Sequence, residues 1–481
     1  MKLRALAKET VIYAVGNTAL RAGAFLLIPL YTHTLNIRDY GVLATLLLTM
    51  QILGILMGLG VRTAFVRFCA EYAEAGKLGR LLGSAYALVL AGGVAVTAVA
   101  ISVMRPLFAA VLHTAEPGFL VFLTCMAALA QTLWMLTVSY FRARNKGVQF
   151  VVLNGAVFVL LASSTAALLL QLRMGLQGVI AAYIGSYGLM WVVVSVAIAM
   201  RTGLAVERST MRRLVRFGFP LIFSMSGDIA IDGSALYAMS LFAGLDQVAV
   251  YSLGYKIAQI AVITLILPFQ LAYEPAVYGA ANSPLLRRFI AEALIHLLLV
   301  FGFVAMAIVL VFRDLMPLIA PPEYARGYDI VFAFLPGVAC MGIHYVGESL
   351  LLIPGKTKLA AGIVCAVTVA GVLLNVLLIR VWGMHGAVAV YDLTHAAMAL
   401  LLLGVGMRHV PVALQWRRLA GSVALPFTGL AAVWWLSRVS SAPLFYALGA
   451  AAVLIILGGA KKFGVLNVSA LRTQEAASYG S

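Results

Sequence analysis

Residues 10–30, TVIYAVGNTALRAGAFLLIPL, form a mainly apolar run with one arginine, Arg21, near its middle. A helix rises about 1.5 Å per residue, so a run of about 20 residues crosses about 30 Å of hydrocarbon. A guanidinium at that depth costs about 2.5–3.5 kcal/mol on insertion scales, so Arg21 should face protein or water rather than lipid. Tyr13, Asn17 and Arg21 recur every four residues and therefore share one helical face. We expect this helix to line a water-filled cavity in which Arg21 meets an anion.

The composition excludes a soluble globular protein. Of 481 residues, 63% are hydrophobic and only 11% are charged, whereas soluble domains have about 25% charged residues. No small-residue cleavage site follows the first apolar run, so we expect it to remain as the first transmembrane helix. The four cysteines lie in or beside apolar runs without metal or redox spacing, and neither a metal nor a cofactor is expected.

The apolar runs predict an all-α polytopic membrane protein with about 14 transmembrane helices. Gly and Pro occur within several runs, which membrane helices tolerate because neighbouring groups satisfy the freed backbone atoms. The predicted spans are 10–30, 41–66, 81–103, 117–141, 148–171, 176–200, 217–243, 249–273, 289–312, 329–353, 359–379, 383–406, 419–437 and 443–460.

Lysine and arginine set the orientation of these spans. With the N-terminus inside, the inner segments hold 24 of the 34 basic residues and the outer loops hold seven. Both ends of the chain are therefore expected in the cytoplasm. The net charge of +17 is then a topogenic signal that also attracts anionic lipids, and no nucleic-acid partner is expected.

The chain contains an internal repeat. GLQGVIAAY at 175–183 matches GMHGAVAVY at 383–391, an offset of 208 residues. Six crossings separate equivalent positions, so the two halves run in the same sense, and a substrate site is expected between them. The expected domains are a six-helix lobe over 1–206, a second lobe over 207–412, an extra helix pair over 413–460 and a cytoplasmic tail over 461–481.

Three cations lie inside the predicted spans, and each is a candidate for substrate binding. Arg21 has no short route to the membrane surface, which favours a functional role. Lys256 shares its helical face with Ser252 and Gln259, which suggests a polar cavity lining. Arg62 lies near the inner end of its span, where snorkelling to the headgroups is the favoured interpretation.

Asp228 and Asp232 lie one turn apart in the seventh span. Two carboxylates at this spacing repel each other, so one of them can hold a proton near neutral pH. A coupling site for H⁺ or Na⁺ is one interpretation, and a structural ion pair with Arg21 or Lys256 is the other. Both remain open.

Asp392 with His395, in the twelfth span, is a weaker ion-coupling candidate. His344 with Glu348, in the tenth span, is also weaker, because both approach the inner end and an interfacial position would explain them. No P-loop, HExxH or GxSxG context occurs, so no catalytic residues are assigned and the chain is not expected to be an enzyme.

A series of short motifs in order resembles the Wzx-type polysaccharide (O-antigen and exopolysaccharide) flippases of the MOP exporter superfamily, which are related to lipid II flippases. The resemblance extends over about residues 10–410. The motifs are IPLYT at 28–32, DYG at 39–41, FGFPL at 217–221, VYS at 250–252, GYKI at 254–257, GKTK at 355–358, LN at 374–375 and GMHGA at 383–387.

The resemblance implies two lobes around a cationic cavity and alternating access in the bacterial inner membrane. The implied cargo is an undecaprenyl-pyrophosphate-linked oligosaccharide, moved from the cytoplasmic to the periplasmic leaflet as a step of lipopolysaccharide or exopolysaccharide biosynthesis. Its cavity cations would be Arg21, Arg62 and Lys256. Implied partners are this lipid-linked oligosaccharide, membrane lipids, H⁺ or Na⁺ as coupling ion, and the polysaccharide polymerase machinery.

Three other functions compete with this interpretation. A MATE-like drug or cation antiporter favours an acidic cavity and 12 helices, which three buried cations and about 14 helices argue against. A membrane glycosyltransferase or polymerase normally needs a large outer loop, and no predicted outer loop exceeds about twenty residues. A lipid II flippase is hard to separate from the Wzx type by sequence.

Overall fold

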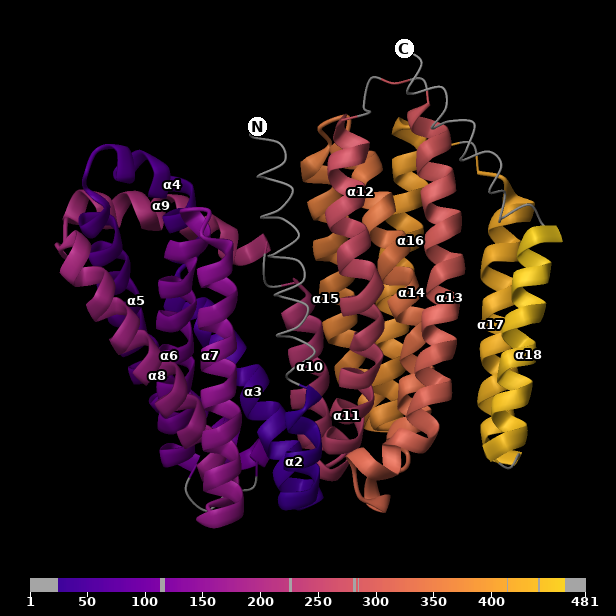
Figure 1. Ribbon diagram of the computed structural model, residues 1–481, viewed down its shortest axis with the longest axis horizontal. Coiled ribbons are helices and arrows are strands. Elements are labelled where there is room, and N and C mark those ends of the chain that lie inside the picture. Colours follow the sequence, from indigo (N-terminus) through magenta and orange to yellow (C-terminus); the bar gives the residue numbers. More distant parts are fainter. Residues whose placement is uncertain are drawn as a thin grey trace. The chain divides into compact units, whose positions relative to one another are not determined.

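The computed structural model describes residues 25–112, 117–224, 227–279, 283, 285–412, 414–439 and 442–462. Throughout these ranges the secondary structure is helical, with short connections (Figure 1). The order is α2 (Leu27–Thr34), α3 (Ile37–Gly58), α4 (Val61–Glu74), α5 (Leu78–Leu112), α6 (Pro117–Ala143), α7 (Gly147–Ala166), η1 (Ala167–Gln171), α8 (Gly175–Thr202), α9 (Arg208–Ser224), α10 (Gly227–Phe242), α11 (Leu245–Ala261), η2 (Val262–Ile266), α12 (Leu267–Gly279), α13 (Leu286–Ile319), η3 (Pro322–Tyr324), α14 (Gly327–Leu352), α15 (Thr357–Trp382), α16 (Met384–His409), α17 (Trp416–Val439) and α18 (Ala442–Lys462).

Eleven helical stretches in the described ranges are long and apolar enough to cross a membrane. Two shorter apolar helices, over Ile229–Phe242 and Leu444–Gly458, add to them. Most of the first predicted span, 10–30, lies outside the described residues. The predicted fold class, an all-α polytopic membrane protein, is confirmed, and α17 and α18 match the predicted last pair.

The helix boundaries recur at the offset seen in the sequence repeat. α3 and α11 begin 208 residues apart, and so do α5 and α13. Gly175 and Gly383 stand at the starts of α8 and α16, and both have φ of 54°. Glycine suits these positions because it adopts positive φ at no steric cost. The division into two lobes at residues 206 and 207 stays a prediction.

The predicted single helix over 41–66 is wrong beyond residue 58. α3 ends at Gly58, and the next two residues are left-handed, with φ of 46° at Leu59 and 67° at Gly60. The chain then re-enters a helix, α4, at Val61. Gly60 lies against the backbone of Gly218 in α9, where a side chain would overlap the carbonyl group. This close approach explains why the helix breaks at a glycine.

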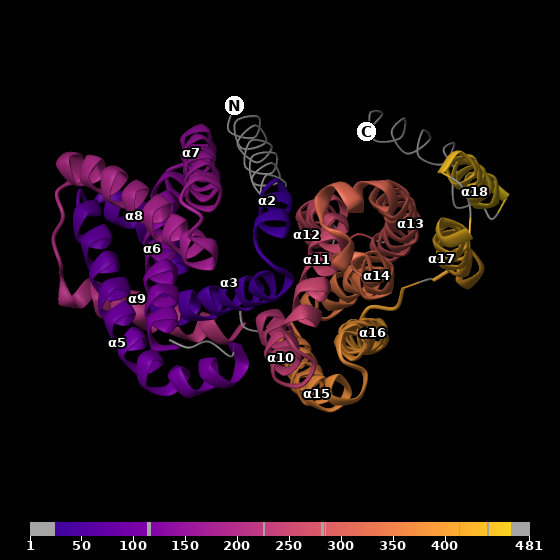
Figure 2. The same cartoon turned by 90° about the horizontal axis from the view of Figure 1, so that it is seen from below.

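By their internal contacts the helices form two compact units. Unit 1 comprises residues 1–252 and 375–387, and unit 2 comprises residues 253–374 and 388–481. Within unit 1, α6 is central and packs against α3, α5, α7 and α8 (Figure 2). Its core contains Trp134 and Phe65, both fully buried.

The amphipathic helix α9 is tied to α4 within unit 1. Arg213 donates two hydrogen bonds to Glu71, at 2.6 and 2.8 Å, and its guanidinium lies 4.2 Å from the centre of the Phe68 ring. Thr210 and Tyr72 are joined by a hydrogen bond of 3.0 Å between their hydroxyls. These contacts hold the segment that enters α10.

Within unit 2, α17 packs against α13 and α18. Gly302 of α13 lies directly against the ring of Pro426 in α17. Arg418 also donates two hydrogen bonds to Glu292, at 2.6 and 2.8 Å. The helix pair at the end of the chain is therefore anchored on α13 by close packing and by a charged pair.

Candidate functional site

The polar face predicted for the first span lies outside the described residues. Tyr13, Asn17 and Arg21 all belong to it, so their roles as cavity lining and anion ligand stay predictions. The cation predicted in the second span, Arg62, is described. It occupies the first turn of α4, directly after the left-handed pair Leu59 and Gly60, and its side chain is exposed. The turn therefore sets the direction in which Arg62 projects, and substrate binding by it stays a prediction.

Lys256 lies on α11, within a stretch long and apolar enough to cross a membrane. Its side chain is half-buried, as is that of Gln259 one turn later. Ser252, one turn earlier, is buried, and its hydroxyl has no hydrogen-bond partner in the structure. The three residues share one face of α11, as their spacing predicted. This face combines a cation with two uncharged polar groups.

Contacts within unit 2 hold α11 in place around Lys256. Gly254 lies against the side chain of Ile330 in α14, where a larger residue would clash. The ring of Tyr255 packs edge-on against Phe334 of α14, at 5.3 Å between centroids, and against Tyr391 of α16, at 5.9 Å. Tyr255, which precedes Lys256, therefore contacts Tyr391, which precedes Asp392. The two predicted site residues lie on helices that pack together at that level.

Asp228 and Asp232 both lie on α10. The side chain of Asp228 is outside the described part of the structure, and that of Asp232 is half-buried. Asn375 of α15 fixes α10 within unit 1, because its Nδ2 donates to the carbonyl oxygen of Ile231 at 3.2 Å and to Ser234 Oγ at 2.8 Å. The Oδ1 atom of Asn375 is buried without a hydrogen-bond partner. Asn375, which forms part of the LN motif, therefore links α15 to α10, a contact that the sequence did not predict.

Asp392 of α16 has a structural contact that the sequence did not predict. Its Oδ1 accepts a hydrogen bond of 2.9 Å from the backbone N–H of Gly337 in α14. Gly337 follows Pro336, and a proline inside a helix disturbs the turn that precedes it. Gly337 also allows the close approach, since a Cβ there would overlap the Asp392 carboxylate. Asp392 thus links α14 to α16, and its ion-coupling role stays a prediction.

His344 and His395 are buried inside unit 2, with 6% and 3% of their surfaces exposed. The Nε2 atom of His344 lies 3.9 Å from Glu348 Oε2 on the same helix. The Nδ1 atom of His395 bonds the carbonyl oxygen of Tyr391 at 2.9 Å. His344 is thus packed among protein atoms, and the interfacial position considered for it and Glu348 stays a prediction.

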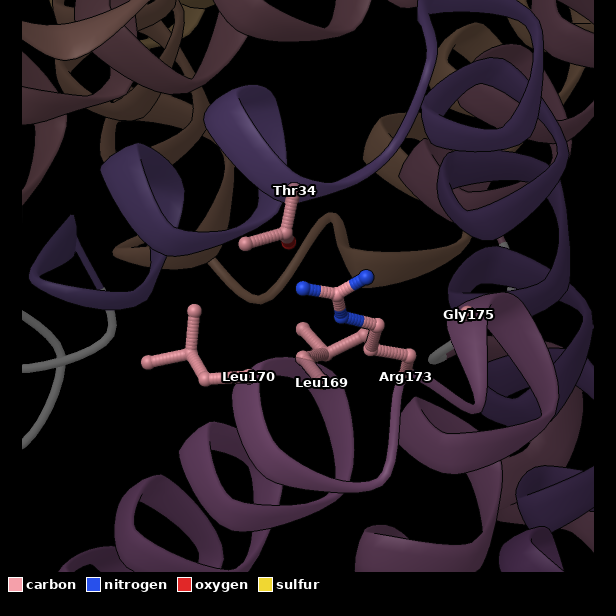
Figure 3. A pocket seen from close by; sticks show the side chains of 5 residues that line it. All are labelled: Thr34, Leu169, Leu170, Arg173 and Gly175. Atoms are coloured by element: carbon pink, nitrogen blue, oxygen red, sulfur yellow. The ribbon is translucent and has the colours of Figure 1, made fainter.

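A cavity of about 350 Å³ lies in unit 1 beside the π-helix η1. Thr34, Leu169, Leu170, Arg173 and Gly175 line it, and the Arg173 guanidinium extends beneath Thr34 (Figure 3). Arg173 has a left-handed φ of 50°, which is uncommon for a residue other than glycine. The orientation predicted from the sequence places this cavity on the outer side, and none of its lining residues is among the predicted site residues.

Comparison with known proteins identifies the family of this chain. A family model described as polysaccharide biosynthesis protein matches residues 6–278. A comparison with curated proteins returns no sequence match.

Several solved structures share the fold. A lipid II flippase, MurJ, in an inward closed conformation is 13% identical with a TM-score of 0.72, covering 94% of this chain and 98% of that one. An inward-facing multidrug resistance MATE family transporter of the MOP superfamily is 14% identical with a TM-score of 0.67, covering 82% and 94%. A MOP superfamily transporter from Pyrococcus furiosus is 14% identical with a TM-score of 0.58, covering 84% and 96%. At these identities the likeness is one of fold.

Proposed function

Because the chain belongs to the polysaccharide biosynthesis protein family, we propose that it is a flippase for undecaprenyl-pyrophosphate-linked oligosaccharide. It moves this lipid from the cytoplasmic to the periplasmic leaflet by alternating access. Both termini lie in the cytoplasm, and the membrane is the bacterial inner membrane. The Wzx-type motifs support the choice of a glycan-bearing lipid as cargo.

The observation that carries the proposal is Lys256 on α11, a cation in a stretch apolar enough to span the bilayer. Charges attract more strongly in surroundings of low dielectric constant than in water, so a lysine at this depth suits a pyrophosphate. An intramembrane cation is also costly, which favours a functional role. Arg21 and Arg62 are the two further cations of the proposed site. The lipid tail stays in the bilayer while the sugars cross through water.

An ion gradient drives the cycle in this proposal. Asp228, Asp232 and Asp392 are the candidates for carrying the coupling ion, H⁺ or Na⁺. The half-buried positions of Asp232 and Asp392 on α10 and α16 suit that role. For Asp392, Asp392→Asn separates coupling from the link to Gly337, because the amide keeps an acceptor oxygen but loses the charge. If Asp392 couples, this variant should lose gradient-driven transport.

A second candidate is a lipid II flippase, favoured by the structural likeness to MurJ over nearly the whole chain. Its substrate also has a lipid pyrophosphate, so the same cations would serve. The two functions differ in the glycan that the lipid carries. Offering the protein lipids with different glycans, and measuring which of them it transports, distinguishes the two functions. The antiporter alternative is less favoured, since the MATE transporter matches a smaller part of the chain.

Reconstituted vesicles test the proposal. Purified protein in vesicles should transfer a fluorescent undecaprenyl-pyrophosphate oligosaccharide between leaflets, and a lipid with no phosphate should not be transferred. Lys256→Met, which removes the charge and keeps an apolar stem, should reduce transfer at least tenfold. Lys256→Arg should keep most of it. Equal activity of the methionine and arginine variants would rule out Lys256 as an anion ligand.

A further inference from the structure

The cavity beside η1 lies where three departures from regular helix geometry occur together. The end of α7 widens into the π-helix η1 over Ala167–Gln171, Arg173 has a left-handed φ of 50°, and Gly175 has a φ of 54°. Single π-helical turns are rare and are frequent at functional sites. Left-handed backbone at a residue other than glycine persists only where the surrounding structure fixes it. The fold therefore holds Arg173 in an unfavourable conformation that places its side chain at the cavity.

The second copy of the sequence repeat differs at this place. At the offset of 208 residues, Thr34 corresponds to Phe242. Arg173 corresponds to Val381, where α15 is still a regular helix. The guanidinium of Arg380, the residue before, lies 4.5 Å from the centre of the Phe242 ring. An aromatic ring thus covers the cation of the second copy, whereas the guanidinium of Arg173 extends beneath a threonine and borders a cavity (Figure 3).

Arg173 is available to bind an anion. Its side chain is exposed, and among the described residues its guanidinium has neither an ion pair nor a hydrogen bond. The hydroxyl of Thr34 already donates to the carbonyl oxygen of Leu30, so the donors that a ligand meets in the cavity are those of the arginine. A guanidinium presents its N–H groups in a planar fork that fits the oxygens of phosphate and carboxylate groups.

The surroundings indicate that the anion belongs to a lipid. The turn over residues 172–174 joins two stretches, Gly147–Gln171 and Gly175–Thr202, that are each long and apolar enough to cross a membrane. A turn between two such stretches lies at the membrane surface, where basic pockets between helices bind lipid headgroups. Leu170 and Leu172 are both more than half exposed, which suits contact with the apolar part of a lipid. A ligand here meets a cation and apolar side chains together.

We propose that the cavity lined by Thr34, Leu169, Leu170, Arg173 and Gly175 binds the phosphate group of a lipid, with Arg173 as the anion ligand. Its volume of about 350 Å³ is at the small end of the range for ligand sites, which suits a headgroup. The phosphate belongs either to a phospholipid of the membrane or to the pyrophosphate lipid of the proposed function. None of the lining residues belongs to the proposed transport site, and binding here does not depend on transport.

Three variants test the site by two different means. Arg173→Gln removes the charge, and Arg173→Gly removes it together with the strain at a φ of 50°, so the glycine variant serves if the glutamine variant does not fold. Thr34→Phe keeps the arginine but covers it, as Phe242 covers Arg380, and Thr34→Leu replaces it if it does not fold. Arg326→Gln is the matched control, because Arg326 is also exposed and lies in a turn, directly before α14 in unit 2.

Photolabelling measures binding at this site in the full chain. Protein in an uncharged detergent is titrated separately with phosphatidylglycerol and with undecaprenyl pyrophosphate, each carrying a photoreactive diazirine beside its phosphate. Mass spectrometry then quantifies the label on residues 167–178. For at least one probe, this label should saturate in wild type and in Arg326→Gln. In the cavity variants, which carry a substitution at Arg173 or Thr34, the half-saturating concentration should rise at least about tenfold, because charge-assisted hydrogen bonds are lost.

The two probes identify the source of the phosphate. A label that depends on the cavity with phosphatidylglycerol alone assigns a phospholipid of the membrane, and one with undecaprenyl pyrophosphate alone assigns the lipid of the proposed function. Such a label with both probes shows that the phosphate itself is recognised. Each of these results supports the site, whether or not the protein transports lipid.

Three results would overturn the inference. The first is a label on residues 167–178 that is the same in wild type and in the cavity variants for both probes. The second is a loss on removing the charge of Arg173 without a loss on covering it, because the charge alone would then attract the lipid. The third is equal labelling by a photoreactive diacylglycerol, which has no phosphate.

Discussion

Replacing Gly60 with alanine is expected to damage the turn that joins α3 to α4 and presents Arg62. Gly60 has a φ of 67°, and a Cβ built on it would overlap the carbonyl group of Gly218 in α9. Two separate costs follow, one from the backbone conformation and one from the packing of the two helices.

The first cost arises because a residue with a Cβ loses about 1–2 kcal/mol when its backbone adopts the left-handed conformation. The second is overpacking against backbone that has little freedom to move, about 1–3 kcal/mol. Their sum is about 2–5 kcal/mol. Gly76 separates the two, because it has the same φ of 67° and nothing lies within 4 Å of its Cβ position. Gly76→Ala should therefore lose only about 1–2 kcal/mol.

Equilibrium unfolding in mixed detergent micelles, followed by tryptophan fluorescence, measures both variants. The free energy of unfolding should fall more in Gly60→Ala than in Gly76→Ala, by about 1–3 kcal/mol. An equal decrease in the free energy of unfolding in the two variants would show that the contact with Gly218 does not contribute to stability. The explanation of the helix break would then be wrong.

Two further predictions concern links between helices. Hydrogen bonds from Arg213 hold the pKa of Glu71 below its usual range, so the pair stabilises the fold above about pH 4.3 and loses this effect as pH falls through the lower folded-state pKa. Glu71→Gln should lower the thermal midpoint more at pH 7 than at pH 3, and an equal loss at both pH values would contradict the pairing. Gly302→Ala pushes a methyl group into Pro426 and should cost about 1–3 kcal/mol in unfolding titrations. Nothing lies within 4 Å of the Cβ position at Gly404, so Gly404→Ala should raise the free energy of unfolding by about 0.5–1 kcal/mol. A lower free energy of unfolding in Gly404→Ala would contradict the packing argument.

The helices were predictable from the sequence because a membrane span needs about 20 apolar residues. The starts of α8 and α16 were found by the repeat, since Gly175 and Gly383 have to adopt positive φ in both copies. The break after α3 was missed for a physical reason. A glycine in an apolar run also occurs in unbroken helices, and the close approach to Gly218, far along the chain, accompanies the left-handed turn.

The candidate site was predictable only in part. Charge in an apolar run identified Lys256 and Asp392, because such residues are rare and costly there. The burial of His344 depends on how α14 packs against α16 through Gly347, which no local pattern contains. The hydrogen bonds of Asn375 were not predictable, because its partners, Ile231 and Ser234, lie on a distant segment of the chain.

The proposed function depends most directly on where lipid-linked oligosaccharide accumulates in cells depleted of this protein. We expect accumulation in the cytoplasmic leaflet, relieved by wild type and by Lys256→Arg but not by Arg21→Ala or Lys256→Met at equal membrane abundance. Normal glycan export in depleted cells, together with altered tolerance to cationic drugs, would contradict the flippase function and favour an antiporter.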